Sequence, residues 1–350
     1  MISFKAITTE EKLNFIKIFQ VLLKSGIPLD LAFKSLIEQT RNPTLKKIFK
    51  KAFERVKKGT PIYQIFEEDP HFGKVFSSFI KVGEESGNLE EALNYLAEWL
   101  ERKSTLEREI ASATLYPKII TFFALFIGGG IFYFVFPKLL PIFETLNVKL
   151  PLQTRVLLVL ANFFKNYGFI FLLGMIGFFL LLKFLLKLPK VKIFFDKIIL
   201  KTPFLGSFVK SYQLAVISQL IYLLFKSGIT ITRTLDITSE AVSFYPYKES
   251  IKTIKEKVLT GEPLSEGIKR YPSLYPEVYV RVLITAEQTG SFESAFSYLG
   301  DFFSSDILRK TKKLPVILEP LILLIIGLFV ALVVSGVIMP IYQITKGLHP

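Results

Sequence analysis

The sequence predicts an all-α membrane protein with two homologous six-helix cytoplasmic bundles and three transmembrane helices. An internal duplication indicates the two bundles, because the segment 22–27 (LLKSGI) returns as 224–229 (LFKSGI), 202 positions later. A long apolar run follows the helical part of each copy. Hydrophobic residues fill 51% of the 350 positions, which is more than a soluble chain usually carries. The excess of apolar side chains is therefore expected in lipid.

The two copies share the spacing of their turn residues. After a one-residue insertion, the segment 82–90 (VGEESGNLE) matches 285–293 (TAEQTGSFE) at an offset of 203. A unit of this length is too long for a solenoid repeat and indicates two homologous domains. The shared motif and turn positions are Gly26, Gly59, Glu84, Gly87, Gly228, Gly261, Glu287 and Gly290. Four prolines lie at the expected ends of membrane spans: Pro117, Pro137, Pro320 and Pro340.

Amphipathic spacing and helix-breaking residues divide the first copy into six helices, and the second copy repeats the same breaks. Gly26 can take the left-handed conformation that often ends a helix, and Pro28 suits the first turn of the next one. Asn88 and Glu91 have the spacing of a capping box at the start of the sixth helix. We expect these helices at about Glu10 to Gly26, Pro28 to Asn42, Thr44 to Lys58, Pro61 to Asp69, Lys74 to Glu84 and Leu89 to Ala113.

Three windows without a charged side chain are long enough to cross a bilayer: Ile119 to Phe136, Asn166 to Leu182, and Pro320 to Thr345. Lys183 and Lys187 can extend their ammonium groups to the membrane surface, so the second span can run further. The predicted order is a first bundle (1–116), a span (117–137), an extracytoplasmic loop (138–165), a second span (166–187), a second bundle (188–318) and a third span (319–345).

The net charge of +14 comes from Lys and Arg that crowd the bundle side of each span. By the positive-inside rule, the N-terminus and both bundles are expected in the cytoplasm. These basic residues lack the interleaved aromatic pattern of an RNA-binding sheet, so no nucleic-acid partner is expected. A lysine-rich face at residues 46–58 favours either a solvated surface or a docking site for an acidic partner; its members are Lys46, Lys47, Lys50, Lys51, Lys57 and Lys58.

The sequence contains no recognisable motif for catalysis or for metal binding. It has no phosphate-binding loop, and two histidines without any cysteine give no zinc pattern. We therefore expect no catalytic residue, cofactor or metal, and no enzymatic activity. The expected spans also lack the ionisable residues that mark an ion path, which disfavours a small-solute transporter. A transporter, or a membrane enzyme with an unrecognised site, is the alternative class.

Glu84 and Glu287 each precede a glycine turn by three residues. In one interpretation the two acids belong to a docking surface or a shared site. In the other, each carboxylate accepts N–H bonds from the start of the following helix, where the helix dipole favours a negative charge. The second interpretation is favoured.

This ordered set of features resembles the type II secretion system F protein and type IV pilus assembly platform (PilC) family. The segment 82–89 is similar to the family's Val-Gly-Glu-x-Ser-Gly-x-Leu motif, and the segments 15–29 and 150–154 (LPLQT) add to the resemblance, which runs from Phe15 to the region of Pro340. The chain departs from the family at Gly73, where a proline is expected, and at Gln288-Thr289, which replace the Glu-Ser of the first copy.

The resemblance implies a non-catalytic platform in the bacterial inner membrane, around which a type IV pilus or type II secretion pseudopilus is assembled. It implies a cytoplasmic assembly ATPase, pilin or pseudopilin subunits, other inner-membrane assembly proteins and further copies of the chain as partners. The chemistry would then belong to the ATPase, and this chain would transmit motion or hold subunits.

Overall fold

A computed structural model describes residues 7–135, 152–186 and 188–347. Every regular element within those ranges is a helix, which confirms the all-α fold class that the sequence predicts. The chain divides into two compact units. Unit 1 comprises Met1–Glu109 and Ile193–Leu308, and unit 2 comprises Ile110–Lys192 and Arg309–Pro350.

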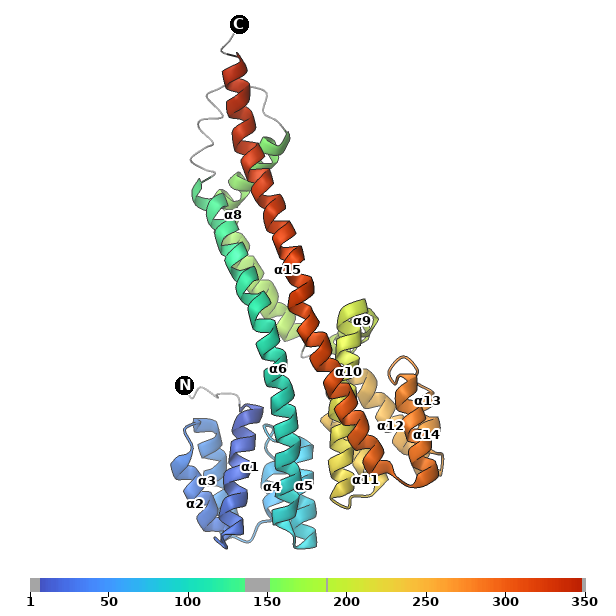
Figure 1. The fold of residues 1–350 in the computed structure, drawn as a ribbon. Helices are drawn as coiled ribbons and strands as arrows, with labels where there is room; N and C mark the ends of the chain where they lie inside the picture. The colour runs from blue at the N-terminus through green and yellow to red at the C-terminus, as the bar shows by residue number, and fades with distance from the viewer. Residues whose placement is uncertain (1–6, 136–151, 187, 348–350) are drawn as a thin grey trace. The chain divides into compact units, whose positions relative to one another are not determined.

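Unit 1 holds both copies of the duplicated sequence, and each copy forms six helices joined by short turns (Figure 1). The first copy consists of α1 (Thr9–Lys24), α2 (Leu29–Gln39), α3 (Pro43–Lys57), α4 (Ile62–Glu67), α5 (Gly73–Ser86) and α6 (Leu89–Gly130). The second copy consists of α10 (Pro203–Lys226), α11 (Ile231–Ala241), α12 (Tyr245–Leu259), α13 (Leu264–Lys269), α14 (Glu277–Thr289) and α15 (Phe292–Gly347). We call these two sets the first and the second bundle.

The described residues between the two copies form further helices. A π-helix, η1 (Ile131–Val135), follows α6 directly, and α8 (Leu152–Leu185) is a single helix of 34 residues. The short α9 (Pro189–Lys201) then leads to α10, with breaks at Leu188-Pro189 and Thr202-Pro203. Because α8 begins at Leu152, much of the predicted loop 138–165 is helical and continuous with the second predicted span.

The expected end of the sixth helix near Ala113 is wrong. Helix α6 continues through Pro117 to Gly130, and α15 continues through Pro320 and Pro340 to Gly347. A proline inside a helix removes one backbone hydrogen bond but does not end the helix when the flanking turns are held. Each bundle therefore shares its last helix with an apolar segment. Pro137 lies outside the described residues.

Four helices of the described ranges are long and apolar enough to cross a membrane by length and composition. Three of them overlap the predicted spans: α6, α8 and α15. The fourth is α10, but 61% of its apolar window is buried inside unit 1. The apolar side chains of α10 therefore pack largely against other helices of unit 1.

Phenylalanine rings fill the core of the first bundle. The Phe15 ring centroid lies 4.6 Å from that of Phe49, and the Phe72 centroid lies 4.6 Å from Phe66 and 4.5 Å from Phe76. Tilted ring pairs at these distances add to the stabilisation from apolar burial. The aromatic cluster joins α1, α3, α4 and α5 into one core.

The core of the second bundle carries buried tyrosines. Tyr279 shares a hydrogen bond with Ser218 at 3.1 Å, Tyr275 shares one with Ser250 at 2.9 Å, and Tyr247 donates to a backbone carbonyl at 2.7 Å. Burial raises the pKa of all three hydroxyls, so they stay neutral at physiological pH. The two bundles thus share a fold but have different cores.

The turn after the first helix has the same geometry in both copies. Gly26 has φ 76° and Gly228 has φ 80°, the left-handed region that favours glycine. The N–H of Ile27 donates to the Leu22 carbonyl at 3.1 Å, and the equivalent bond closes the turn at Gly228. Positive φ also occurs at Gly59, Gly73, Gly87, Gly261 and Gly290.

Replacing Gly26 by Val should destabilise the first bundle by about 1–3 kcal/mol, because a β-branched residue is strained at this φ. Nothing lies within 4 Å of a Cβ built at Gly26, so the loss comes from the backbone alone. The fluorescence of Trp99, the single tryptophan and a buried residue of α6, reports unfolding of this bundle in urea. Gly26→Asn is the control, because Asn tolerates the left-handed region. An unchanged midpoint for Gly26→Val would contradict the argument.

Candidate functional site at the junction of the bundles

The two motif glutamates hold the start of a short helix in each bundle. The Glu84 carboxylate accepts the N–H of Ile62 at 2.7 Å and the N–H of Tyr63 at 2.8 Å, at the first turn of α4. In the second bundle, Glu287 accepts the N–H of Ser265 at 3.1 Å and the hydroxyl of the same residue, at the first turn of α13. The same contact thus occurs twice.

This contact corrects the sequence interpretation. We expected Glu84 and Glu287 to cap the helix that follows each of them, but they cap α4 and α13, which precede them in the chain. The first N–H groups of a helix have no intrahelical partner, and Pro61 and Pro263 at the N-cap positions offer no side-chain acceptor. A carboxylate from another helix supplies it and complements the positive end of the helix dipole.

Gly83 explains why α5 and α6 can meet next to this carboxylate. A Cβ built at Gly83 would lie 2.6 Å from the Ala92 Cβ and 2.9 Å from the Leu89 Cα. Asn88 caps α6 by accepting the Glu91 N–H at 3.3 Å, as the capping-box spacing predicts. The segment 82–91 is therefore a joint that fixes α4, α5 and α6 to one another.

The two bundles meet at a junction that the sequence did not indicate. The junction is formed by α5 and α6 of the first bundle and by α10 and α11 of the second, and α15 reaches its edge. Leu220 and Leu223 of α10 are fully buried there and belong to the same apolar cluster as the first core. Ile237 of α11 joins them.

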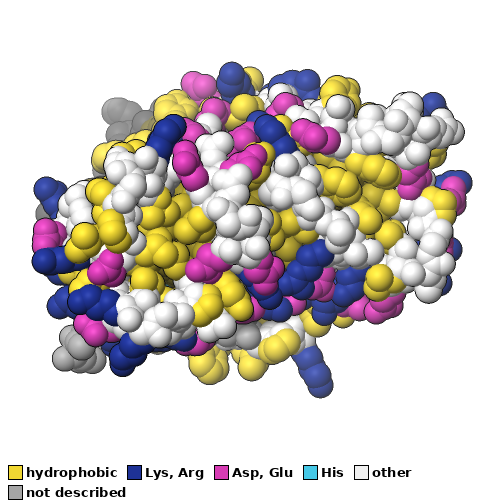
Figure 2. Space-filling model, turned by 90° about the horizontal axis from the view of Figure 1, so that it is seen from below, with side chains coloured by type: hydrophobic (Ala, Val, Ile, Leu, Met, Phe, Trp, Pro, Cys, Tyr) yellow, Lys and Arg dark blue, Asp and Glu magenta, His cyan; other side chains and the backbone are white. Residues whose placement is uncertain are grey.

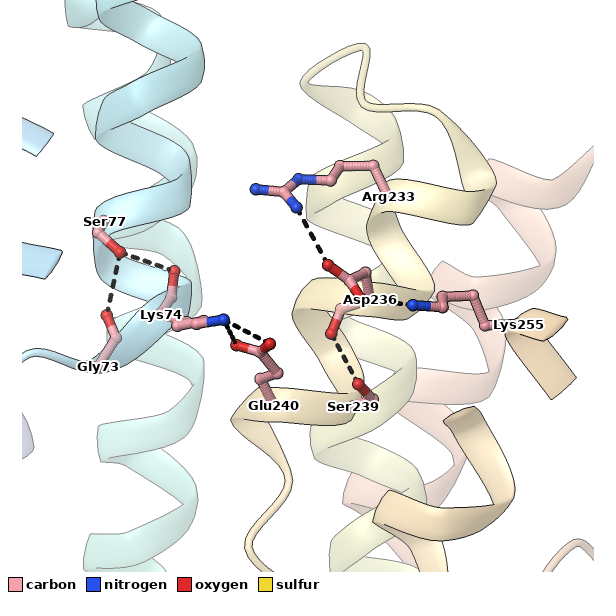
Figure 3. Close-up of polar contacts among 8 residues, drawn as sticks. All are labelled: Gly73, Lys74, Ser77, Arg233, Asp236, Ser239, Glu240 and Lys255. Carbon is pink, nitrogen blue, oxygen red and sulfur yellow. Dashed lines mark hydrogen bonds and ion pairs between the residues drawn. The ribbon is translucent and has the colours of Figure 1, made fainter. Parts of the chain in front are cut away.

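Charged residues link α5 to α11 across the junction (Figure 3). Lys74 forms an ion pair with Glu240. One turn away, Asp236 accepts from Lys255 at 2.7 Å and from Arg233 at 3.0 Å. The hydrogen bond from Lys255 lowers the pKa of Asp236, and the positive charges of Arg233 and Lys74 act in the same direction. The α11 side of the junction thus keeps a negative charge opposite Lys74.

Arg102 makes the second polar link, between α6 and α15. Its guanidinium contacts Glu98 at 2.9 Å and Asp301 at 3.0 Å, and lies 5.9 Å from the Tyr222 ring centroid. Nearby, the Lys226 ammonium lies 5.8 Å from the Tyr95 ring centroid. Planar guanidinium groups suit such combined carboxylate and ring contacts.

Two hollows open along the junction. One of about 250 Å³ is lined by residues of α6, α10 and α15, including Arg102 and Asp301. The other, of about 190 Å³, lies beside Lys12, Lys74 and Lys103. Burial lowers the pKa of Lys12, and the charge of Lys103 lowers it further. The Lys12 ammonium donates to the His71 carbonyl.

Metal ions in proteins need a donor set of several side chains. Among residues 7–135, 152–186 and 188–347, no group of three His, Cys, Asp or Glu side chains could hold a metal ion. His71 contacts Asp69 at 2.8 Å, within the turn between α4 and α5. The polar contacts described above join helices to one another.

The lysine-rich face predicted at residues 46–58 lies on and just after α3. Lys46 is half-buried and the other five lysines are exposed. Lys51 contacts Glu68 at 3.4 Å, and Arg55 makes a bidentate contact with the same carboxylate at 2.6 and 2.9 Å. In the view from below, Lys and Arg side chains alternate with Asp and Glu around apolar side chains (Figure 2). Exposed basic residues are therefore spread over this view.

The junction residues Lys74, Arg102, Glu240 and Asp301 were missed from the sequence. A signal was present: Leu220 and Leu223 occupy the positions of Ile18 and Val21 in the first copy, outside the core stripe. A helix that is apolar on more than one face indicates burial on more than one face. No local pattern pairs a lysine with a glutamate 166 positions away.

Replacing Glu84 by Ala should destabilise the first bundle by about 1–2 kcal/mol, because two N–H groups at the start of α4 lose their acceptor. The urea midpoint of Trp99 fluorescence measures the loss. Glu85→Ala is a matched control, since Glu85 is exposed and only pairs with Lys81 at 3.7 Å. Equal midpoints for the two variants would show that the carboxylate contact is not stabilising.

Comparison with known proteins supports one family for the whole duplicated architecture. The family model described as type II secretion system (T2SS), protein F, matches residues 15–137 and again residues 217–340. The chain is 26% identical over 323 residues to the type IV pilus assembly protein PilC of Thermus thermophilus, covering 92% of this chain and 80% of that one. It is 25% identical over 334 residues to PilC of Pseudomonas aeruginosa, covering 94% and 88%.

A third relative, the type II secretion system protein F of Vibrio cholerae, is 22% identical over 343 residues, covering 98% of this chain and 84% of that one. The two matched segments begin within α1 and α10 and end after η1 and within α15, so they cover most of both bundles and of the helices α6 and α15. With more than half of its length matched, this membrane protein belongs to the type II secretion system protein F family.

Proposed function

We propose that the chain is a non-catalytic platform in the bacterial inner membrane for assembly of a type IV pilus or a type II secretion pseudopilus. In this role it couples a cytoplasmic assembly ATPase to pilin or pseudopilin subunits, and other inner-membrane assembly proteins and further copies of the chain complete the complex. The relatives named as pilus assembly and type II secretion proteins support this class of function.

The observation that carries the proposal is the continuity of α6 and α15. Each begins inside a bundle and runs without a break into an apolar segment, over 42 and 56 residues respectively. At about 1.5 Å per residue, both are much longer than a bilayer's hydrocarbon core of about 30 Å. A continuous helix moves as one piece, so displacement of a bundle would reach the segment where pilin subunits approach.

The lysine-rich face of α3 supports a docking site for the ATPase on the first bundle. Its exposed ammonium groups suit an acidic partner surface, and such contacts mainly set the association rate and the choice of partner. A purified platform of this kind should not hydrolyse ATP, because the ATPase carries the chemistry.

The proposed orientation has the N-terminus and both bundles in the cytoplasm, and the basic residues beside the apolar helices support it. Alkaline phosphatase, which folds only outside the cytoplasm, should be active when fused after Lys149 and inactive when fused after Lys257. Expression of both fusions is checked by immunoblot. Two active fusions, or two inactive ones, would refute this orientation.

Reversing charges on α3 should weaken ATPase binding by roughly tenfold, about 1.4 kcal/mol. The variant changes Lys47, Lys50 and Lys58 to Glu and keeps Lys51, which contacts Glu68. Binding of the cognate ATPase to the detergent-solubilised chain is measured at low and high salt, and filament assembly is measured in cells. The binding of the unaltered chain should be salt-sensitive, because exposed charges are screened beyond about 10 Å near 0.1 M salt.

The matched variant reverses Lys248, Lys252 and Lys257 on α12, the counterpart of α3 in the second bundle. The Trp99 midpoint shows that the first bundle stays folded. Loss of binding only with the α12 variant would move the docking site to the second bundle. Normal binding and assembly with both variants would refute docking through these helices.

A further inference from the structure

The junction between the bundles joins two different faces of one duplicated fold. The first bundle contributes the surface of α5 and α6, which we call the front face. The second bundle contributes the surface of α10 and α11, which we call the back face. Because both bundles have the same helices, the first has a back face on α1 and α2, and the second has a front face on α14 and α15. The junction uses neither of these.

The back face of the first bundle carries exposed apolar side chains. Ile18 and Val21 of α1 are 37% and 63% exposed. Their counterparts in the second copy, Leu220 and Leu223, are 0% exposed because the front face of the first bundle covers them. The same two positions are thus apolar in both copies and are buried in only one.

The front face of the second bundle is open in the same way. Tyr298 is 53% exposed, and its counterpart Tyr95 lies at the junction beside Lys226. Phe302 stands at the position of Trp99, and its ring packs 6.0 Å from that of Tyr298. Two aromatic residues therefore line the front face of the second bundle, and the equivalent face of the first bundle forms the junction.

We propose that the front face of the second bundle binds the back face of the first bundle in a second copy of this chain, repeating the internal junction between molecules. Such a head-to-tail contact joins two different surfaces, and it generates a ring when the rotation closes and an open chain when it does not. The inference is argued from the duplication, and it rests on the proposed function in one respect, because that function includes further copies of the chain.

The residues available support the apolar and aromatic part of this contact. Lys24 occupies the position of Lys226, so its ammonium can meet Tyr298 as Lys226 meets Tyr95. The Lys24 side chain is exposed, and its ammonium forms a long ion pair with Glu90 at 3.8 Å. Both partners of the proposed contact are therefore accessible.

The Lys74–Glu240 ion pair of the internal junction has no equivalent in the proposed contact between molecules. Glu277 stands at the position of Lys74, and Glu38 at that of Glu240. Arg281, which pairs with Glu277 on α14, is the positive charge on this face. Contact between molecules would therefore differ in charge from contact between the bundles of one chain, which helps each face to select its own partner.

Cysteine cross-linking tests the contact directly, because the chain contains no cysteine. Two differently tagged chains, Lys24→Cys and Tyr298→Cys, are produced together in membranes and treated with a short bismaleimide. We expect a cross-linked product that carries both tags. A chain with both Tyr95→Cys and Lys226→Cys is the internal control, since it places the reagent at the equivalent positions of the known junction.

Three results would overturn the proposal. Cross-linking of Lys24→Cys chains to one another, or of Tyr298→Cys chains to one another, in place of the mixed product would indicate contact between identical faces. Lys50 is an exposed position on α3, away from the proposed contact. Cross-linking of Lys50→Cys chains to Tyr298→Cys chains as efficient as that of Lys24→Cys chains would indicate random collision. No mixed product while the internal control reacts would mean that another partner covers these faces.

A second variant separates the contact from chance proximity. Val21→Glu, introduced into the Lys24→Cys chain, should reduce the mixed product at least fivefold by placing a charge in the apolar contact. Leu31→Glu is the matched control, because Leu31 is also exposed on the first bundle, at 49%, but its counterpart Arg233 stays exposed in the second bundle. Equal losses for both variants, with unchanged Trp99 midpoints, would overturn the assignment of this face.

Discussion

The burial of α10 is the constraint on which the arrangement of unit 1 depends. Leu220, Leu223 and Leu224 have no exposed surface, because α10 packs both in its own bundle and against the first core. Burying each such side chain stabilises the folded state by about 1.5–3 kcal/mol. The partly exposed Lys74–Glu240 pair contributes about 0–1 kcal/mol. Apolar burial therefore holds the two bundles together, and the ion pair selects their register.

Turn positions could be predicted from sequence because their causes are local. Gly26 ends α1 with a positive φ that few other residues accept, and Pro43 begins α3 after the Asn42 cap. The target of Glu84 could not be predicted, because its carboxylate reaches a helix start 22 positions earlier, which depends on how α4 and α5 pack. The continuity of α6 through Pro117 has the same cause, since packing decides whether a proline ends a helix.

The duplication preserved the frame of the fold and allowed the surfaces and cores to diverge. Glu84 and Glu287 cap equivalent helices, so this contact is preserved in both copies, although Ala286 stands at the position of Gly83. The cores differ, with Phe76 in the first copy at the position of Tyr279 in the second. A buried hydroxyl needs a partner, and Ser218 supplies it only in the second copy. The two bundles are therefore not interchangeable, as a junction between unlike faces requires.

Arg102 connects the last helices of the two bundles. It stands on α6 and reaches Asp301 on α15, within unit 1 and close to the point where both helices leave it. The guanidinium also contacts the Glu98 carboxylate on α6, and this contact orients the Arg102 side chain towards α15. Because the Asp301 carboxylate is largely exposed, this ion pair contributes about 0–1 kcal/mol to the free energy of unfolding. The pair therefore orients α6 and α15 at the edge of the junction, while the burial of α10 supplies most of the free energy that holds the two bundles together.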